Sequence, residues 1–171
     1  MRHEGRVAPE ALGAARIRAD RDGPRPIPRG EALDLLASVP LGRIVFTENA
    51  LPAVRPVNHL VDRGAIVLRT RSGSALDLYV GNHASGTRRA VVVAYEADRI
   101  DELTRRGWSV IIVGLARAVE DSADLERYRG LPDPWALEYA DRAIRITPDV
   151  ATCLMTGAAA AADPASKPWL P

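Results

Sequence analysis

Apolar residues recur along the chain with two different spacings, and the longer spacing predicts three short helices. Over residues 29–39 the apolar positions Leu33, Leu36 and Ala37 are separated by one to three residues, which is typical of an amphipathic helix, and Pro40 ends it. A change to the same helical spacing after a serine-rich turn predicts a helix of one to two turns over 72–80. Early acidic residues predict a third short helix over 122–128.

The remaining apolar segments alternate with polar residues or form short unbroken runs, which is typical of β-strands. Gly114 lies in the middle of the longest segment, where we expect a bulge or bend. Strands joined mostly to their neighbours in sequence, without long alternating helices or a G-x-G-x-x-G turn, predict a small antiparallel barrel and not a doubly wound parallel sheet. The expected strands cover residues 42–48, 52–61, 65–71, 90–97, 108–120 and 142–146, with 150–155 as a candidate continuation.

The chain is expected to form one folded domain between two extensions. Its 171 residues suffice for a single core. Residues 1–28 are rich in Arg, Ala and Pro and predict a mobile arm, and residues 157–171 form a low-complexity tail. The folded domain is therefore placed at residues 29–156.

Charge and cysteine content exclude several classes of function. Lys+Arg 23 against Asp+Glu 22 gives a net charge of +1, so we expect neither nucleic acid nor a membrane as partner. Lys167 is the single lysine and lies near the end of the chain, which argues against a pyridoxal-type enzyme with a buried lysine. Cys153 is the single cysteine, which excludes an internal disulfide and fits a reducing compartment. With no apolar leader or spanning run, we expect a cytoplasmic protein.

The polar residues do not form a metal or hydrolase motif. His3, His59 and His83 lack the spacing of metal ligands, so no metal site is expected. The chain has no G-x-S-x-G elbow, so a hydrolase finds little support.

Three motifs in a fixed order resemble a known family. The segment RPVNHLVDRGAIVLRTRSGSAL is followed by VVVAYEADRIDELTRRGWSVIIVGLAR, and together they lie within residues 33–155. This arrangement resembles the actinobacterial branch of the pyridoxamine 5′-phosphate oxidase-like family of flavin-binding split barrels. The resemblance implies a mainly β fold with short helices, a six-stranded antiparallel split β-barrel, FMN as cofactor and a homodimer that closes over it.

The turn after the third strand is the expected phosphate site. A phosphate dianion needs cationic, hydroxyl and amide donors, and such donors meet at the start of a helix. Gly73 allows the backbone to approach a ligand closely. The chain has Ala75 where relatives commonly carry a lysine, which weakens this grip. The alternative is a polar turn with solvated arginines. The cofactor residues that the resemblance implies here are Leu68, Arg69, Thr70, Ser72, Gly73 and Ser74.

Two further segments are expected to contact the flavin ring. The family's matching strand borders the isoalloxazine, which implies ring contacts for Arg55, Pro56, Val57 and Asn58. Pro56 also predicts an open edge, because proline cannot donate to a ladder. The alternatives are a surface ion pair for Arg55 and a backbone-satisfying role for Asn58.

The start of the longest strand is the second of these segments. The resemblance implies that Trp108 and Ser109 approach the cofactor from the partner subunit. The alternative is that Trp108 is a core or interface anchor.

The first hypothesis is an FMN-dependent oxidoreductase that acts on a small-molecule redox substrate, with catalytic residues unknown. The second is a carrier or sensor without turnover that binds flavin, or haem through His59. A third is that the deazaflavin F420 replaces FMN.

Overall fold

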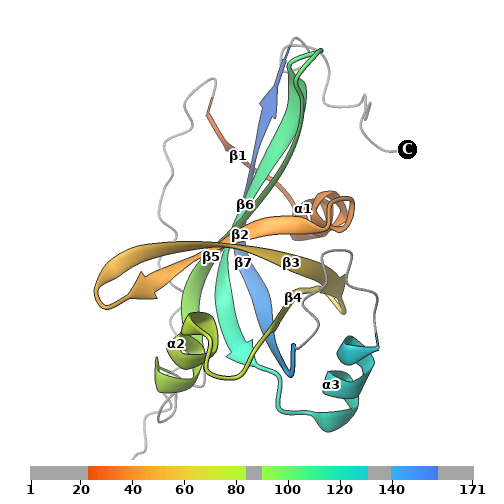
Figure 1. The fold of residues 1–171 in the computed structure, drawn as a ribbon. Coiled ribbons are helices and arrows are strands. Elements are labelled where there is room, and N and C mark those ends of the chain that lie inside the picture. The colour runs from red at the N-terminus through yellow and green to blue at the C-terminus, as the bar shows by residue number, and fades with distance from the viewer. Residues whose placement is uncertain (1–22, 84–89, 131–139, 158–171) are drawn as a thin grey trace, which may run out of the picture.

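The protein is described by a computed structural model that covers residues 23–83, 90–130 and 140–157 (Figure 1). The expected arm up to residue 22, the loop at 131–139 and the tail from 158 lie outside the described residues. None of the helices in the described part of the chain has the length and apolar character needed to span a membrane. The described elements are β1 (Arg25–Pro26), α1 (Arg29–Ala37), β2 (Leu41–Glu48), β3 (Leu51–Asp62), β4 (Ala65–Thr70), α2 (Ala75–His83), β5 (Val91–Asp101), β6 (Arg106–Ala118), α3 (Ser122–Arg129) and β7 (Arg142–Thr156).

Six of these strands close into a ring. The neighbours run β7, β4, β3, β2, β5, β6, and β6 pairs again with β7, every pair being antiparallel. The register of β6 against β7 shifts between Val113 and Gly114, which confirms the predicted bulge. The mainly β fold with short helices, a six-stranded antiparallel split β-barrel, is thus confirmed.

The core fills the inside of the barrel because alternate strand residues point inward. Ile44, Tyr95 and Ile112 are fully buried there, and α1 closes the barrel against β3, β6 and β7. Gly42 lies directly against the Tyr95 side chain, and a Cβ at Gly42 would meet Tyr95 Oη and, at 2.6 Å, the carbonyl oxygen of Glu96. The barrel therefore depends on a glycine at this position.

Among the described residues, a helix covers one side of the outer surface of the barrel. The helix α3 packs a second small cluster (Val67, Val119, Tyr128 and Ala143) against the outside of β4 and β7. On the remaining strands the outer face keeps exposed apolar side chains, among them Val54, Val92 and Val113. We call the part of this face carried by β2, β3, β5, β6 and the second half of β7 the open face.

Several boundaries differ from the expected ones. α2 covers Ala75–His83 where 72–80 was expected, and three other differences change the sheet. The last residues of the expected arm form β1, because Arg25 and Pro26 pair with Cys153 and Thr152 of β7. The strand β5 runs on to Asp101, beyond the expected end at residue 97, because the added residues continue the pairing with β6. β7 is one strand of 15 residues and not two, because its middle stays paired with β6.

Candidate functional site

Two of the expected site segments meet where β3 and β4 separate. Their ladder runs from Asp62–Ala65 to His59–Leu68 and ends there. Within the described residues, no strand pairs with the edge of β3 from Leu51 to Val57 that faces away from β2. We call this edge, together with the β4–α2 turn at Thr70–Ser74, the fork. The predicted open edge near Pro56 therefore exists.

The backbone of β3 presents alternating donors and acceptors to the fork. A two-residue turn at Asn49 and Ala50, both with positive φ, joins β2 to β3 and closes with the hydrogen-bonded pair Glu48–Leu51. Counting in twos from that pair, Ala53, Arg55 and Val57 form the hydrogen-bonded pairs with β2. The residues after each of them, Val54, Pro56 and Asn58, direct their backbone groups away from β2. Pro56 has a carbonyl but no N–H group, so the N–H donors on this edge belong to Val54 and Asn58.

The side chains of the expected ring contacts lie on two faces of β3. Pro56 and Asn58 belong to the outer face, whereas Val57 packs against the main core on the inner face. Arg55 is also on the inner side, where its guanidinium contacts Glu48 Oε2 at 2.9 Å and the carbonyl oxygen of Val54 at 3.1 Å. One ligand therefore cannot contact all four side chains on one face of β3. It can contact the backbone edge of the strand, which lies between the two faces.

The β4–α2 turn holds two hydroxyls together at the start of α2. Thr70 Oγ1 and Ser74 Oγ are 2.7 Å apart, and Ser74 Oγ accepts from the backbone N–H of Asp77 at 3.2 Å. Ser74 thus acts as the N-cap of α2. Since the first four N–H groups of a helix lack intrahelical partners, those of Ala75 and Leu76 remain available for a ligand. Gly73 has φ +75 and open space where a Cβ would lie.

Two carboxylates occupy the other amides of this turn. The N–H of Ser72 donates to Asp141 Oδ1 at 2.7 Å, and the N–H of Gly73 donates to Asp77 Oδ2 at 2.9 Å. The bond from Ser72 lowers the pKa of Asp141. Ser72 and Gly73 therefore stabilise the turn. Of the predicted phosphate site, the groups left for a ligand are the hydroxyls of Thr70 and Ser74 and the first amides of α2.

Arg69 and Leu68 do not join these hydroxyls. Arg69 shares the outer face of β4 with Val67, and its Nη1 donates to the carbonyl oxygen of Tyr128 in α3 at 3.1 Å. Leu68 is fully buried in the main core, so only its backbone can approach a ligand. The structure thus separates Arg69 from Thr70, its neighbour in the sequence.

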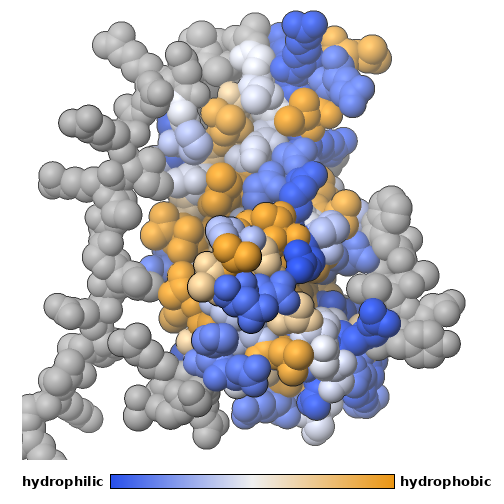
Figure 2. Space-filling view, turned by 60° about the vertical axis from the view of Figure 1, so that its left-hand side comes forward, coloured by the Kyte–Doolittle hydropathy of each residue, from blue (hydrophilic) through white to orange (hydrophobic). Residues whose placement is uncertain are grey.

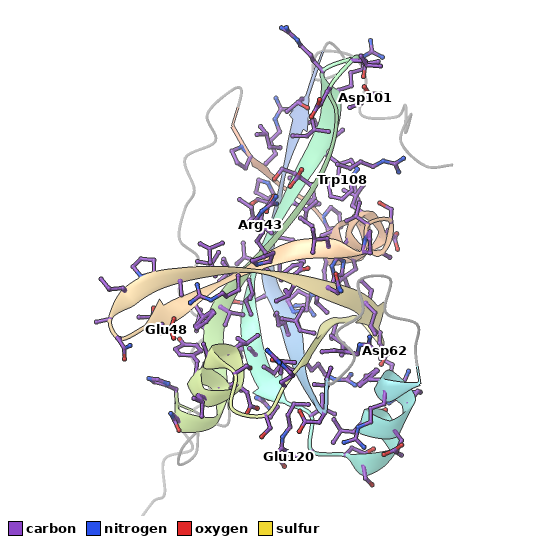
Figure 3. All side chains as sticks on the ribbon, viewed as in Figure 1. Arg43, Glu48, Asp62, Asp101, Trp108 and Glu120 are labelled. Atoms are coloured by element: carbon purple, nitrogen blue, oxygen red, sulfur yellow. The ribbon has the colours of Figure 1, made fainter. Side chains whose placement is uncertain are left out.

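Trp108 and Ser109 lie far from the turn in the same chain (Figure 3). Trp108 is 2% exposed and packs in the main core. Ten residues separate it from Ala118, the end of β6 nearer to Thr70, which is about 33 Å along an extended strand. A ligand whose phosphate occupies the turn does not reach Ser109 of its own chain.

Ser109 belongs to a polar cluster that sequence reasoning missed. Its hydroxyl donates to Glu96 Oε1 at 3.2 Å, and Arg43 Nη1 contacts Glu96 Oε2 at 2.9 Å and Asp98 Oδ1 at 2.7 Å. Arg43, Glu96 and Asp98 are brought together by the pairing of β2 with β5 and of β5 with β6. The alternation of charged residues in YEAD was the available signal.

His59 has both ring nitrogens engaged. Its Nε2 lies 2.8 Å from the carbonyl oxygen of Leu36, which only an N–H can satisfy, so Nδ1 accepts from Tyr95 Oη at 2.6 Å. Burial lowers the pKa of His59 and keeps the ring neutral. Beside it lies a cavity of about 370 Å³ lined by Ala37–Pro40 and His59–Val61. As a haem ligand, His59 would first have to give up one of these two bonds.

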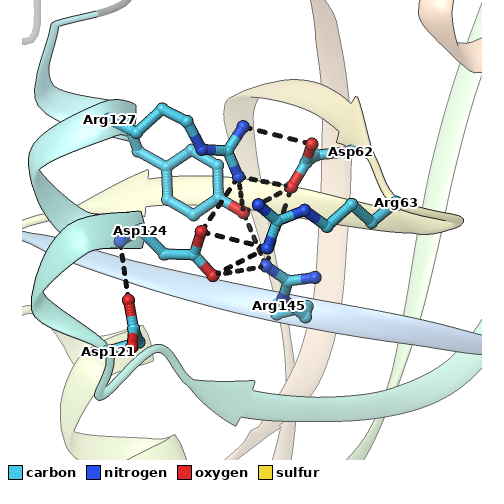
Figure 4. Close-up of polar contacts among 7 residues, drawn as sticks. Asp62, Arg63, Asp121, Asp124, Arg127 and Arg145 are labelled. Atoms are coloured by element: carbon cyan, nitrogen blue, oxygen red, sulfur yellow. Dashed lines mark hydrogen bonds and ion pairs between the residues drawn. The ribbon is translucent and has the colours of Figure 1, made fainter.

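A second polar network, also unexpected from the sequence, fixes α3 to the outside of the barrel (Figure 4). Tyr128 Oη donates to Asp62 Oδ2 at 2.7 Å and accepts from Arg145 Nη2 at 2.6 Å. Arg127 contacts both Asp62 and Asp124. These groups satisfy one another, so we assign the network to stability.

Of the arrangements in the described residues, the fork fits a flat heterocycle with a phosphate tail best. The alternating carbonyl and N–H groups of β3 match the polar edge of such a ring. The hydroxyl pair and the first amides of α2 match a phosphate oxygen set. The carboxylates of Asp77 and Asp141 reduce the positive potential there, so the fit is good at the ring and weaker at the phosphate.

Comparison with known proteins agrees with this assignment of fold. The model of the family described as pyridoxamine 5′-phosphate oxidase matches residues 28–154. An uncharacterized protein of Mycobacterium tuberculosis, Rv0080, is 47% identical over 124 residues, which is 72% of this chain and 80% of that protein.

Two solved structures illustrate what the fold carries elsewhere. The FAD-binding protein of Mycobacterium smegmatis is 30% identical, with a TM-score of 0.57 over 77% of this chain and 98% of the other. The FAD- and haem-binding protein of the same organism has a TM-score of 0.57 at 13% identity, over 75% of this chain and 71% of the other, and shows the shared fold alone.

Proposed function

The chain belongs to the pyridoxamine 5′-phosphate oxidase family, and on that basis we propose that it binds a flavin nucleotide at the fork and works as an FMN-dependent oxidoreductase. The observation that carries the proposal is the unpaired edge of β3 beside the capped start of α2. Within the described residues, the fork joins backbone groups that point away from β2 to a set of hydroxyl and amide donors.

The residues of the fork would divide the work of binding between them. Val54, Pro56 and Asn58 would hold the ring edge through their backbone, and Thr70 and Ser74 would bind the phosphate. A bound flavin supplies the electron transfer itself, while the protein orients the ring and excludes water. The substrate in this proposal is a small redox-active molecule.

The proposal also specifies that the flavin is FMN. A relative that is 30% identical binds FAD, and this chain lacks a lysine at the turn to neutralise the terminal phosphate of FMN. FMN remains our choice because the hydroxyl pair suits a terminal phosphate, and FAD, F420 and haem are the alternatives. Mass spectrometry of the group released by denaturation distinguishes the four.

We further propose that two copies of the chain form the complete site. Val54, Val45, Ala94, Val113 and Val150 lie side by side on successive strands of the open face. Figure 2 shows hydrophobic residues grouped across the middle of the side on which the β2–β3 hairpin comes forward. A row of five apolar residues across five strands costs free energy in water, and a second copy that covers it would also bring its Ser109 toward the fork.

The dimer is tested by Val113→Asp, with Leu78→Asp on the exposed side of α2 as control. Val113 is 36% exposed and Leu78 50% exposed, so neither change should unfold the chain. Analytical ultracentrifugation should give a dimer for the wild type and the control and a monomer for Val113→Asp. A wild-type monomer at micromolar concentration contradicts the proposal.

The flavin is tested by the absorbance of the purified protein and by titration of the stripped protein with FMN and FAD. We expect a flavin spectrum, or quenching of flavin fluorescence with a micromolar or lower Kd. No binding of either flavin contradicts the proposal. If FMN binds but neither NAD(P)H nor dithionite with an acceptor cycles it, the chain is a carrier and not an enzyme.

A further inference from the structure

A polar cluster borders the apolar row of the open face. Ser109 lies on the same face of β6 as Val113, about 13 Å along the strand, and Glu96 and Arg43 come from the strands β5 and β2. A second copy that covers Val113 is therefore expected to lie against this cluster as well. The cluster needs an explanation, because charged residues are depleted at the centre of protein interfaces.

The proton of the Ser109 hydroxyl is committed to Glu96. Ser109 Oγ donates to Glu96 Oε1 at 3.2 Å, and the Glu96 side chain is 23% exposed. A carboxylate can only accept hydrogen bonds, whereas a hydroxyl has one proton and two lone pairs. Ser109 therefore presents an acceptor, and not a donor, to a group that approaches the open face.

Arg43 holds the Glu96 carboxylate in this orientation. Its Nη1 contacts Glu96 Oε2 at 2.9 Å, which leaves Oε1 for Ser109. The same nitrogen contacts Asp98 Oδ1 at 2.7 Å, so the guanidinium is fixed between two carboxylates. The hydrogen bonds of the described residues connect Asp98 to Arg43 but not to Ser109, which makes Asp98 a matched control for Glu96.

We propose that Glu96, held by Arg43, is a positioning residue that makes Ser109 an acceptor for an N–H or O–H group of the flavin bound in the fork of the other copy. This inference rests on the proposed function, including its dimer. The contact must cross the dimer, because a ligand in the fork of the same chain does not reach Ser109. A flavin offers donors at its ring N–H and at the hydroxyls of its ribityl chain.

The first test titrates the stripped protein with FMN. In Glu96→Gln the amide oxygen must face Arg43, so the amide NH2 faces Ser109 and releases its hydroxyl proton. Ser109 then meets the donor of the ligand with a donor, and we expect the Kd for FMN to rise about threefold to tenfold. Ser109→Ala should give a loss of the same size. The double variant should lose no more than Ser109→Ala alone, and Asp98→Asn should stay within about twofold of the wild type.

Hybrid dimers, isolated with two affinity tags, test whether the contact crosses the interface. Ser74→Asp keeps an N-cap for α2 but repels a phosphate, so the fork of this variant should not bind FMN. In a hybrid with a Ser109→Ala copy, the one working fork belongs to the Ser109→Ala copy and faces the intact Ser109 of the other. The hybrid should therefore bind FMN with wild-type affinity. A hybrid with the Kd of the Ser109→Ala dimer would place the contact within one chain and contradict the inference.

Lumiflavin, which has the ring of FMN without the ribityl chain, identifies the donor. If Glu96→Gln weakens lumiflavin as much as FMN, the inference holds with the ring N–H as donor. If Glu96→Gln weakens FMN alone, the inference holds with a ribityl hydroxyl as donor.

The remaining outcomes separate the inference from the proposed function. If the wild type binds FMN and Glu96→Gln binds it equally well, or if Glu96→Gln adds its full loss to that of Ser109→Ala, Glu96 does not act through Ser109 and the inference is wrong. If Asp98→Asn shows the same loss as Glu96→Gln, the cluster has a structural role and the inference is again wrong. If the wild type binds no flavin, the proposed function fails, and the inference fails with it. Circular dichroism melting curves and analytical ultracentrifugation confirm that each variant is folded and dimeric.

Discussion

The network beneath α3 predicts how the stability of the barrel depends on pH. Asp62 accepts hydrogen bonds from Arg127 at 2.8 and 3.2 Å and from Tyr128 at 2.7 Å, and its side chain is 16% exposed. Chiefly the bond from Arg127, and then that from Tyr128, lowers the pKa of Asp62 from 3.8 to about 2. The folded state therefore favours the ionised carboxylate. Asp62→Asn removes this titration while keeping the size of the side chain.

The size of the effect follows from the shift. A lowering from 3.8 to about 2 corresponds to about 2 kcal/mol between the two protonation states. Because the network is partly open to water, we expect Asp62 to contribute about 1–2 kcal/mol at neutral pH. The contribution is complete above the unfolded pKa of about 4 and is lost as pH falls through the folded pKa of about 2. By pH 3 about half of it should be gone.

Urea unfolding followed by circular dichroism between pH 7 and pH 3 measures this contribution. The difference in unfolding free energy between wild type and Asp62→Asn should be about 1–2 kcal/mol at pH 7 and should shrink by about half at pH 3. Tyr128→Phe removes one donor and keeps the ion pair with Arg127, so it should leave most of the pH dependence in place. A difference that stays constant across this range refutes the assignment of Asp62 to the network.

Three further predictions concern other positions. Ala50→Gly should stabilise the fold by about 1 kcal/mol in thermal unfolding, because Ala50 has φ 64 in a turn that favours glycine. Gly42→Ala should destabilise it by about 3 kcal/mol or more, because the new Cβ meets Tyr95 and the backbone of Glu96, whereas Gly30→Ala, with open space in α1, should be neutral or stabilising; equal melting temperatures for the two variants would contradict this. Burial raises the pKa of Cys153 to about 11, so the thiol should react with Ellman's reagent at pH 8 only after unfolding, and rapid reaction of the native protein would show that it is accessible.

Local patterns in the sequence predicted most elements of the fold. The helical spacing of Leu33 and Leu36 predicted α1, and Gly114 predicted the bulge in β6, because each feature is decided by residues close together in the chain. The full length of β5 could not be predicted in the same way. Asp98 and Arg99 are too polar to indicate a strand, and they are held in one by pairing with Ser109 and Trp108.

The sequence indicated which segments form the fork, but it did not show which partner each side chain contacts. The open edge near Pro56 follows from a property of one residue, and the structure contains it. The period of two in a strand already implied that Arg69 and Thr70 point to opposite faces. What the sequence could not show is that α3 folds back to bind Arg69, since that contact joins residues 59 positions apart.

Hydrogen–deuterium exchange of the stripped protein with and without saturating FMN tests most directly whether the fork holds a flavin. Binding there should slow exchange at the amides of Val54 and Asn58 and at Ala75 and Leu76, and should leave the amides around the cavity beside His59 unchanged. Slower exchange confined to residues 37–40 and 59–61, with 54–58 and 75–76 unaffected, would contradict the account and place the ligand in that cavity.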